Sequence, residues 1–194
     1  VQSGQTLALV GGNLTLEGGN LTALGGRIEL GSVAGNSFVT LTPTNPGWAL
    51  GYEGVNTFED IHLSQSATVD TGITAGENTV KDASSTIQVR GRSVTLTDGS
   101  SLLNNTFSSK SVGSIAVTAS ESIELIGTSA SGFPSSITSS VQAIRDPTTG
   151  EVLQESTGNG GNLSLTTRRL IVRDGAAVSS NTFSKGSGGD LNIN

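Results

Sequence analysis

The sequence predicts an all-β fold, a β-solenoid in which turns of parallel strands stack on one another and some turns carry lateral loops. Three observations predict this class. The stretch 87–118 recurs without a gap at 163–194, and alternating apolar positions inside such a repeat are typical of stacked arrays. Glycine-centred units also repeat every seven residues near the start of the chain. Finally, only 34% of residues are apolar and 27 are glycine, which suits a thin core with a few aliphatic side chains per turn.

The long repeat predicts columns of apolar side chains. The offset between its two copies, from position 87 to position 163, carries Val94 onto Leu170 within a matching alternation of apolar and polar positions. Because successive side chains of a strand point to opposite faces, these positions are expected to line the interior. The unit Asn-Thr-Phe-Ser recurs at 105–108 and 181–184, and we expect it to form stacked ladders with its phenylalanine as an inner corner plug.

The short repeat predicts the length of the first turn. The units Gly-Gly-Asn, Gly-Gly-Asn and Gly-Gly-Arg begin at residues 11, 18 and 25, and each is followed by a short alternating segment. Three such units of seven make a turn length of 21, one circuit of a three-sided coil, and the glycine pairs permit sharp corners. A helix is disfavoured, because each glycine pair would cost about 2 kcal/mol.

Later spacings predict longer turns. Segments 87–114 and 163–190 each form a turn of length 28, whereas the segment between them, 115–162, has a length of 48. A stacked core cannot accept extra residues, so the surplus within 130–162 is expected to leave the stack as a lateral loop. Turn lengths between 21 and 28 would give about seven to eight turns in all.

Residues 39–58 interrupt this rhythm. They contain the only tryptophan, Trp48, and the only tyrosine, Tyr52, together with Pro43 and Pro46, which exclude a central strand. We interpret the segment as an excursion that packs over one flank of the stack. Its aromatic residues would form a structural clasp, which we prefer, or an exposed binding loop.

Charge and composition argue against several classes of function. The formal net charge is −6, whereas a nucleic-acid partner requires a clustered basic face. The small basic cluster Arg168, Arg169 and Arg173 is assigned to an outer strand face in preference to an anion site. The absence of cysteine excludes disulfides and thiol chemistry. No apolar run approaches the roughly 20 residues of a membrane span, so we expect a protein that is not membrane-spanning.

A carbohydrate-active enzyme is the main alternative, because catalysis on such a fold needs carboxylates gathered on one exterior face. The densest candidate is Glu59 and Asp60 with His62, and Arg90 or Arg92 could lie one turn further along. A solvated outer strand face explains these residues more simply. Asp-Gly and glycine-rich runs are interpreted as turn and corner signals. We therefore predict no enzyme activity, catalytic residue, metal or cofactor.

Four stretches carry a family resemblance: GGNLTLEGGNLTALGGRIELGSVAGN at 11–36, LTPTNPGWALGYEGV at 41–55, SVTLTDGSSL at 93–102 and NTFS at 105–108. Together they resemble cyanobacterial members of the filamentous haemagglutinin-like exoprotein family, the secreted partners of two-partner secretion systems. The resemblance implies a right-handed parallel β-helix. It also implies that residues 1–58 are the end of a secretion domain and residues 59–194 the first repeats beyond it. The Asn-Pro-Asn-containing motifs of that secretion domain are absent here.

The function that follows is a secreted or surface-displayed adhesin or structural exoprotein with a rigid stalk. The expected partners are an outer-membrane transporter during export and a glycan or protein on a host or neighbouring cell. The candidate contact residues are Trp48, Tyr52, Phe133 and Arg145. The stalk of a contact-dependent toxin is a second alternative. Because the chain opens mid-pattern at Val1 without a signal peptide, we expect it to be an internal piece of a longer protein.

Overall fold

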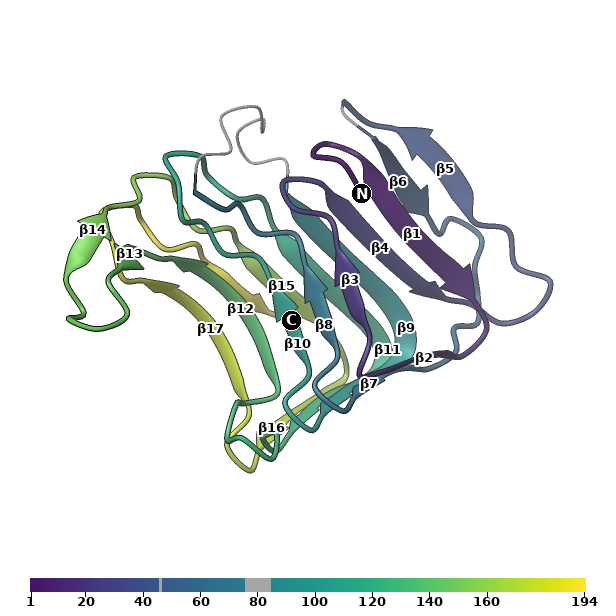
Figure 1. The fold of residues 1–194 in the computed structure, drawn as a ribbon. Coiled ribbons are helices and arrows are strands. Elements are labelled where there is room, and N and C mark those ends of the chain that lie inside the picture. Colours follow the sequence, from purple (N-terminus) through teal and green to yellow (C-terminus); the bar gives the residue numbers. More distant parts are fainter. Residues whose placement is uncertain (46, 76–84) are drawn as a thin grey trace.

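Parallel strands wound into a stack of turns make up the protein, in a computed structural model that describes residues 1–45, 47–75 and 85–194 (Figure 1). Throughout these ranges the chain forms strands, turns and loops and no helix, which confirms the predicted all-β class. The strands are β1 (Thr6–Gly11), β2 (Leu14–Glu17), β3 (Asn20–Thr22), β4 (Arg27–Ser32), β5 (Thr40–Pro43), β6 (Trp48–Gly51), β7 (Ile61–Ser64), β8 (Thr68–Asp70), β9 (Thr86–Thr97), β10 (Ser101–Leu103), β11 (Ile115–Ile126), β12 (Ser136–Val141), β13 (Ile144–Arg145), β14 (Val152–Gln154), β15 (Leu163–Thr166), β16 (Arg169–Arg173), β17 (Ala177–Thr182) and β18 (Leu191–Ile193).

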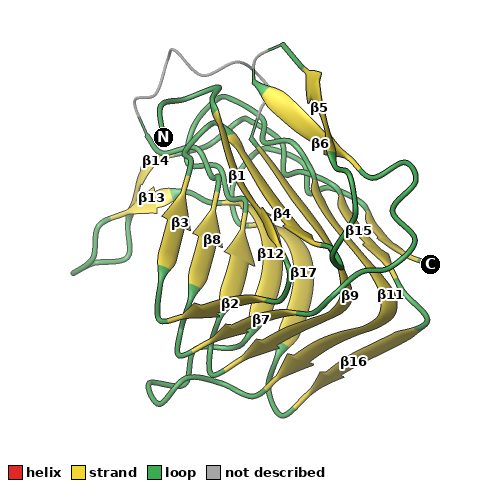
Figure 2. Ribbon diagram, turned by 90° about the vertical axis from the view of Figure 1, so that its right-hand side faces the viewer, coloured by secondary structure: helices red, strands yellow, loops and turns green. Residues whose placement is uncertain are grey.

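Three columns of parallel strands run along the stack (Figure 2). The first column has the order β1-β4-β9-β11-β15-β18. The second contains β2, β7, the later halves of β9 and β11, and β16. The third has the order β3-β8-β10-β12-β17. Strands β9 and β11 pass from the first column into the second, and their pairing shifts register between Ala119 and Ser122.

The register of the first column confirms the predicted turn lengths. Thr6 pairs with Arg27, and the residue numbers of these partners differ by 21. Ile87 pairs with Ile115 and Leu163 with Leu191, and in both pairs the difference is 28. The partners Ile115 and Leu163 differ by 48. The offset of the long repeat is therefore two successive steps along this column, from Ile87 through Ile115 to Leu163.

The number of turns was overestimated from the sequence. The first column holds six strands in the part of the chain that is described, which corresponds to five turns and the start of a sixth rather than seven to eight. The reason is that two turns are long: the paired positions Arg27 and Thr86 differ by 59, and Ile115 and Leu163 by 48. Chain that leaves the stack laterally adds length without adding turns.

The core consists of columns of aliphatic side chains, one from each turn. The register places Leu14, Ile61, Val94, Ile123 and Leu170 above one another. The three central members are almost fully buried, and Leu170 packs partly buried against the same cluster. Because turns stack about 4.8 Å apart, each side chain is in van der Waals contact with those of the turns before and after it.

Glycines form a tightly stacked corner. Gly158 and Gly161 lie against Lys110 and Gly113 of the turn before, and Gly186 and Gly189 lie against Gly158 and Gly161 in the same way. A Cβ atom at any of these four glycines would overlap with a backbone carbonyl oxygen of the preceding turn. The glycine-rich runs are thus corner elements, as the sequence predicted.

In the Asn-Thr-Phe-Ser units, the threonine rather than the phenylalanine points inward, contrary to the prediction. Thr106 is buried, and its hydroxyl donates to the Lys110 carbonyl at 2.7 Å; Thr182 donates to the Gly186 carbonyl at the same distance. The phenylalanine that follows each threonine points outward by strand alternation. Phe183 is 55% exposed, so the expected inner plug is wrong. Nor do the two units stack directly, since Val141 lies between their threonines.

Replacing Gly161 by alanine should destabilise the stack, because the new Cβ would push the turn away from the Gly113 carbonyl. We expect the free energy of unfolding to fall by about 3 kcal/mol. Urea titration followed by circular dichroism measures this. Gly12→Ala is the matched control, since a Cβ there would meet nothing within 4 Å. Equal midpoints for the two variants would contradict the close corner contact.

Candidate functional site

An antiparallel hairpin outside the parallel columns carries the candidate aromatic residues of the first excursion. Strands β5 and β6 pair with each other and lie beside β1 and β4 (Figure 1). The Thr6 hydroxyl of β1 donates to the Trp48 carbonyl and accepts from the Trp48 amide, both at 2.9 Å. The excursion is therefore fastened to the first turn as well as to the second, from which it emerges.

The excursion has a small apolar core of its own. Val33, Leu50, Tyr52 and Phe58 are buried together against the outer face of the stack. Gly31 of β4 lies beneath the Tyr52 ring, and a Cβ at this position would overlap with the phenol. The buried position of Tyr52 agrees with a clasp and leaves its ring unavailable to a partner on this surface.

Arg90 of β9 is held by the aromatic side chains of the excursion. Its guanidinium carbon lies 5.4 Å from the centroid of the Tyr52 ring and 5.0 Å from that of Phe58, within the range of cation–π attraction. Burial, followed by the nearby Glu29 carboxylate, raises the pKa of Tyr52, and the Arg90 charge opposes that rise. The phenol stays neutral, and the aromatic faces fix the cation in place.

A buried carboxylate lies beneath the same hairpin. Glu29 points to the outer face of β4 yet is fully covered, and it pairs with Arg27. Arg27 also donates to Gln88 at 3.1 Å, and Gln88 donates to the Leu50 carbonyl at 3.4 Å. Loss of water raises the pKa of Glu29, and this outweighs the opposing effect of Arg27.

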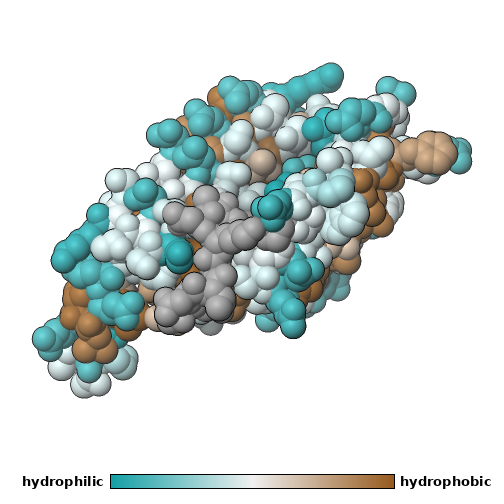
Figure 3. All heavy atoms as spheres, turned by 90° about the horizontal axis from the view of Figure 1, so that it is seen from above, coloured by the Kyte–Doolittle hydropathy of each residue, from teal (hydrophilic) through white to brown (hydrophobic). Residues whose placement is uncertain are grey.

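The four candidate contact residues do not form one site. Trp48 is 50% exposed on β6, whereas Tyr52 is buried. Phe133 is 69% exposed in the loop after β11, and Arg145 is exposed on β13. The β5–β6 and β13–β14 hairpins lie at opposite ends of the molecule, where apolar surface gathers (Figure 3).

Phe133 is presented by a loop that is closed by hydrogen bonds. The Ser129 amide donates to the Phe133 carbonyl at 2.7 Å, and the Phe133 amide donates to the Ser129 hydroxyl at 3.1 Å. The ring borders a shallow groove of about 350 Å³ whose floor includes the stacked hydroxyl residues Thr68, Ser101 and Ser136. This arrangement offers an apolar face beside a row of hydroxyl groups.

Within 130–162, the segment that leaves the parallel columns is the antiparallel pair β13–β14 with its connecting turn. Strand β12 stays in the third column between β10 and β17. In the hairpin turn, Asp146 accepts hydrogen bonds at 2.8 Å from the amides of Thr148 and Thr149, which lowers the pKa of its carboxyl group. Arg145 donates to the Gly150 carbonyl at 3.2 Å across the same turn.

Of the two candidate catalytic carboxylates, Asp60 forms an ion pair. Arg92 pairs with Asp60 at 2.6 Å and approaches Glu121 at 3.9 Å, so the predicted proximity of Arg92 and Asp60 is present. His62 points outward, as expected, but its ring nitrogen lies 3.4 Å from the Thr97 hydroxyl rather than against Asp60. In the three described ranges, no group of three or more His, Cys, Asp or Glu side chains is placed to hold a metal ion.

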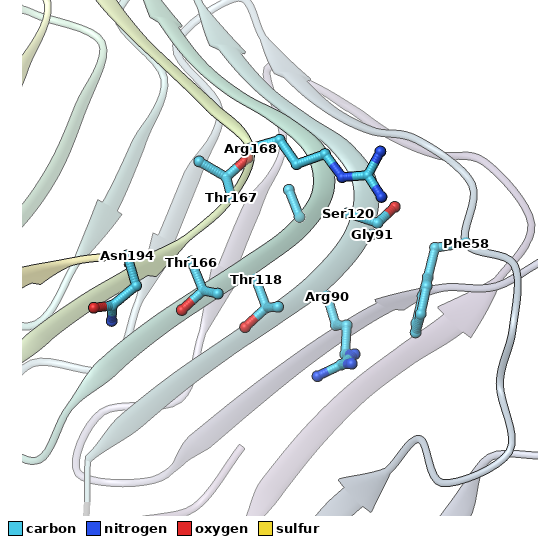
Figure 4. A pocket seen from close by; sticks show the side chains of 10 residues that line it. Phe58, Arg90, Gly91, Thr118, Ser120, Thr166, Thr167, Arg168 and Asn194 are labelled. Atoms are coloured by element: carbon cyan, nitrogen blue, oxygen red, sulfur yellow. The ribbon is translucent and has the colours of Figure 1, made fainter.

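A larger groove of about 380 Å³ lies along the outer side of the stack (Figure 4). Thr118 and Thr166 stand in a row that leads to Arg90, with Phe58 at the end of the row and Arg168 on the opposite side. The row follows the register of the first column, in which Arg90, Thr118 and Thr166 are successive partners. Sequence reasoning missed this groove because it depends on which residues of different turns become neighbours; the repeat spacings between these turns were the available signal.

The family comparison identifies the N-terminal part of the chain: residues 1–81 match the model of the TPS secretion domain. This match supports a two-partner secretion exoprotein. No curated protein and no solved structure matches it. The matched range contains the first turn, the β5–β6 excursion and strands β7 and β8.

The secretion domain has an outer-membrane transporter as its partner and marks the exoprotein for export across the outer membrane. The resemblance noted in the sequence is therefore confirmed at the level of two-partner secretion, while its cyanobacterial type stays a prediction. The described part of the chain contains no helix with the length and apolar character that crossing a membrane requires.

Glu29 should make the stability of the exoprotein fall as the pH rises. Its pKa is raised in the folded protein, so its favourable contribution is present below the ordinary value of 4.5 and is lost as the pH passes through the higher folded value. We therefore expect Glu29→Gln to gain stability relative to the unmodified protein between pH 4 and pH 7. Urea midpoints across this range measure the difference, and a difference independent of pH would show that Arg27 compensates the buried charge fully.

Proposed function

We propose that the exoprotein is a right-handed parallel β-helical stalk that is exported through its outer-membrane transporter and acts as an adhesin or structural protein at the cell surface or after release. The observation that carries the proposal is the secretion-domain match over residues 1–81. We place the end of the secretion-type segment at residue 58 and the β-helix repeats, with their lateral insertion, in 59–194.

The pairing pattern supports a stalk. Successive strands in each column are parallel, and almost all crossovers between parallel strands of one sheet are right-handed. Turns joined by backbone hydrogen bonds along a single axis make a structure that contacts other molecules with its sides. Such a shape suits presentation of binding loops away from a cell.

Lateral segments supply the contact surface in this proposal. Trp48 and Phe133 expose aromatic rings, and the β13–β14 hairpin exposes Leu153 together with Arg145. Exposed aromatic residues and arginines on loops are typical of binding surfaces. The partner would be a glycan or protein on a host or neighbouring cell.

Binding is favoured over catalysis because several carboxylates form ion pairs with arginines. Asp60 and Glu121 share Arg92, and Glu124 pairs with Arg169 at 3.1 Å. Among the described residues that line it, the 380 Å³ groove has no carboxylate side chain. We therefore propose a protein without enzymatic activity of its own.

Removal of the lateral contacts should abolish cell binding without unfolding the stalk. The test variant combines Trp48→Ser and Phe133→Ser with replacement of residues 144–154 by a short Gly-Ser linker, which leaves β12 in place. We expect a loss of binding of about tenfold or more, measured by flow cytometry of cells incubated with labelled protein.

Phe183→Ser is the matched control, because this ring is also exposed but lies on the stack. It should bind cells as the unmodified protein does. Circular dichroism verifies that each variant is folded. If the folded triple variant kept full cell binding, the adhesive role of the lateral segments would be refuted.

A further inference from the structure

Within the described part of the chain, two arginines in the 380 Å³ groove have no carboxylate partner, whereas four other arginines do. Arg27, Arg92, Arg169 and Arg173 each form an ion pair with an acidic side chain. Arg90 and Arg168 line the groove, and across the described chain neither has a hydrogen bond or ion pair. This is unexpected in a protein with 16 acidic and only 10 basic residues. The groove is a local site of uncompensated positive charge.

The Arg90 cation is positioned before any ligand arrives. The Tyr52 and Phe58 rings restrict its guanidinium group, so little conformational entropy remains to be lost on binding. A neighbouring groove of about 340 Å³ on the hairpin side includes Glu53, but this carboxylate is not within ion-pair distance of Arg90. Arg168 is exposed on the opposite side of the 380 Å³ groove and can turn toward a bound anion.

Hydroxyl groups repeat along the floor at the spacing of the turns. Thr118 and Thr166 occupy the same outward position in consecutive turns, about 4.8 Å apart. A ligand with polar groups repeating along a chain can meet one such hydroxyl group per turn. The Phe58 ring closes one end of the row and adds an apolar face.

A peptide strand is a less suitable ligand for this groove. Addition of a strand requires an open sheet edge with free backbone groups. Here the floor is the side-chain face of β9, β11 and β15, whose backbone groups are already paired with one another. Side-chain hydroxyls, an aromatic face and guanidinium groups instead match a sugar chain that bears carboxylate or sulfate groups.

We propose that this groove binds a linear anionic polysaccharide along the stack, with Arg90 and Arg168 contacting its carboxylate or sulfate groups and the threonine hydroxyls contacting its sugar hydroxyls. The proposal rests on the proposed adhesive function and names a ligand class for a surface separate from the β13–β14 hairpin.

Direct binding to purified polysaccharides tests the proposal. The protein is titrated with polygalacturonate, dextran sulfate and neutral dextran, and affinity is measured by biolayer interferometry. We expect binding to at least one of the two anionic polymers, weaker binding at higher salt, and none to dextran. Preference for polygalacturonate would assign carboxylate groups to the ligand, and preference for dextran sulfate would assign sulfate groups.

Arg168→Gln should weaken binding about tenfold, because one charge-assisted contact is lost. Arg173→Gln is its control, an exposed arginine outside the groove that is paired with Asp174. Thr118→Asp should weaken binding further by placing a carboxylate in the row, and Thr95→Asp, on the outer face of β9 outside the groove, should not.

Unchanged affinity of Arg168→Gln, binding to neither anionic polymer, or equal binding to dextran would overturn the proposal. If these results occurred while cells were still bound through the lateral segments, the groove would be excluded and the adhesive function retained.

Discussion

Register between successive turns is the constraint on which the structure depends. Each turn satisfies its backbone groups by pairing with the turns before and after it, so the apolar positions of all turns must coincide. The column from Leu14 through Val94 to Leu170 shows the result. A slip of one residue would turn a whole segment's apolar side chains toward water. The length of chain between two stacked strands is much less constrained, since the difference between paired positions varies from 21 to 59 in the first column.

Strict register between stacked strands, together with variable length of the chain between them, explains why additional residues form lateral hairpins. Both β5–β6 and β13–β14 are antiparallel pairs that satisfy their own backbone groups, so they can leave the stack without exposing unpaired polar groups of the columns. The corner glycines show the opposite case. There the backbone of one turn lies directly against the next, and even a methyl group is excluded. Whether the fold tolerates an insertion or a larger side chain therefore depends on where in the turn the change occurs.

Much of the fold could be predicted because it follows from local periodicity. Alternation identified the inward positions such as Val94, and repeat spacing identified the lengths of the first turn and of the three turns after Ile87. Contacts between turns could not be read in the same way. The alternation that places Thr106 inside also places its neighbouring phenylalanine outside, but the shared motif suggested a plug.

The candidate site was harder to predict than the fold, because its residues come from different turns. The burial of Tyr52 depends on the glycine at position 31, and the cation held by its ring comes from residue 90. Arg168 belonged to a basic cluster in the sequence, yet only the structure separates it from Arg169, which has a carboxylate partner. Pairing register, rather than residue type, decides which charges remain free.

The fastening of the β5–β6 hairpin has a consequence for how the N-terminal end opens. The hairpin and the residues that follow it touch β1 through Thr6, β4 through Gly31 and β9 through Arg90. A stack held only by neighbour contacts would fray one turn at a time from its end. Because this brace spans three consecutive turns, the terminal turn cannot peel away without releasing Trp48. Local fluctuations at this end should therefore occur as one cooperative unit, with amide hydrogen exchange slowed alike across all three strands.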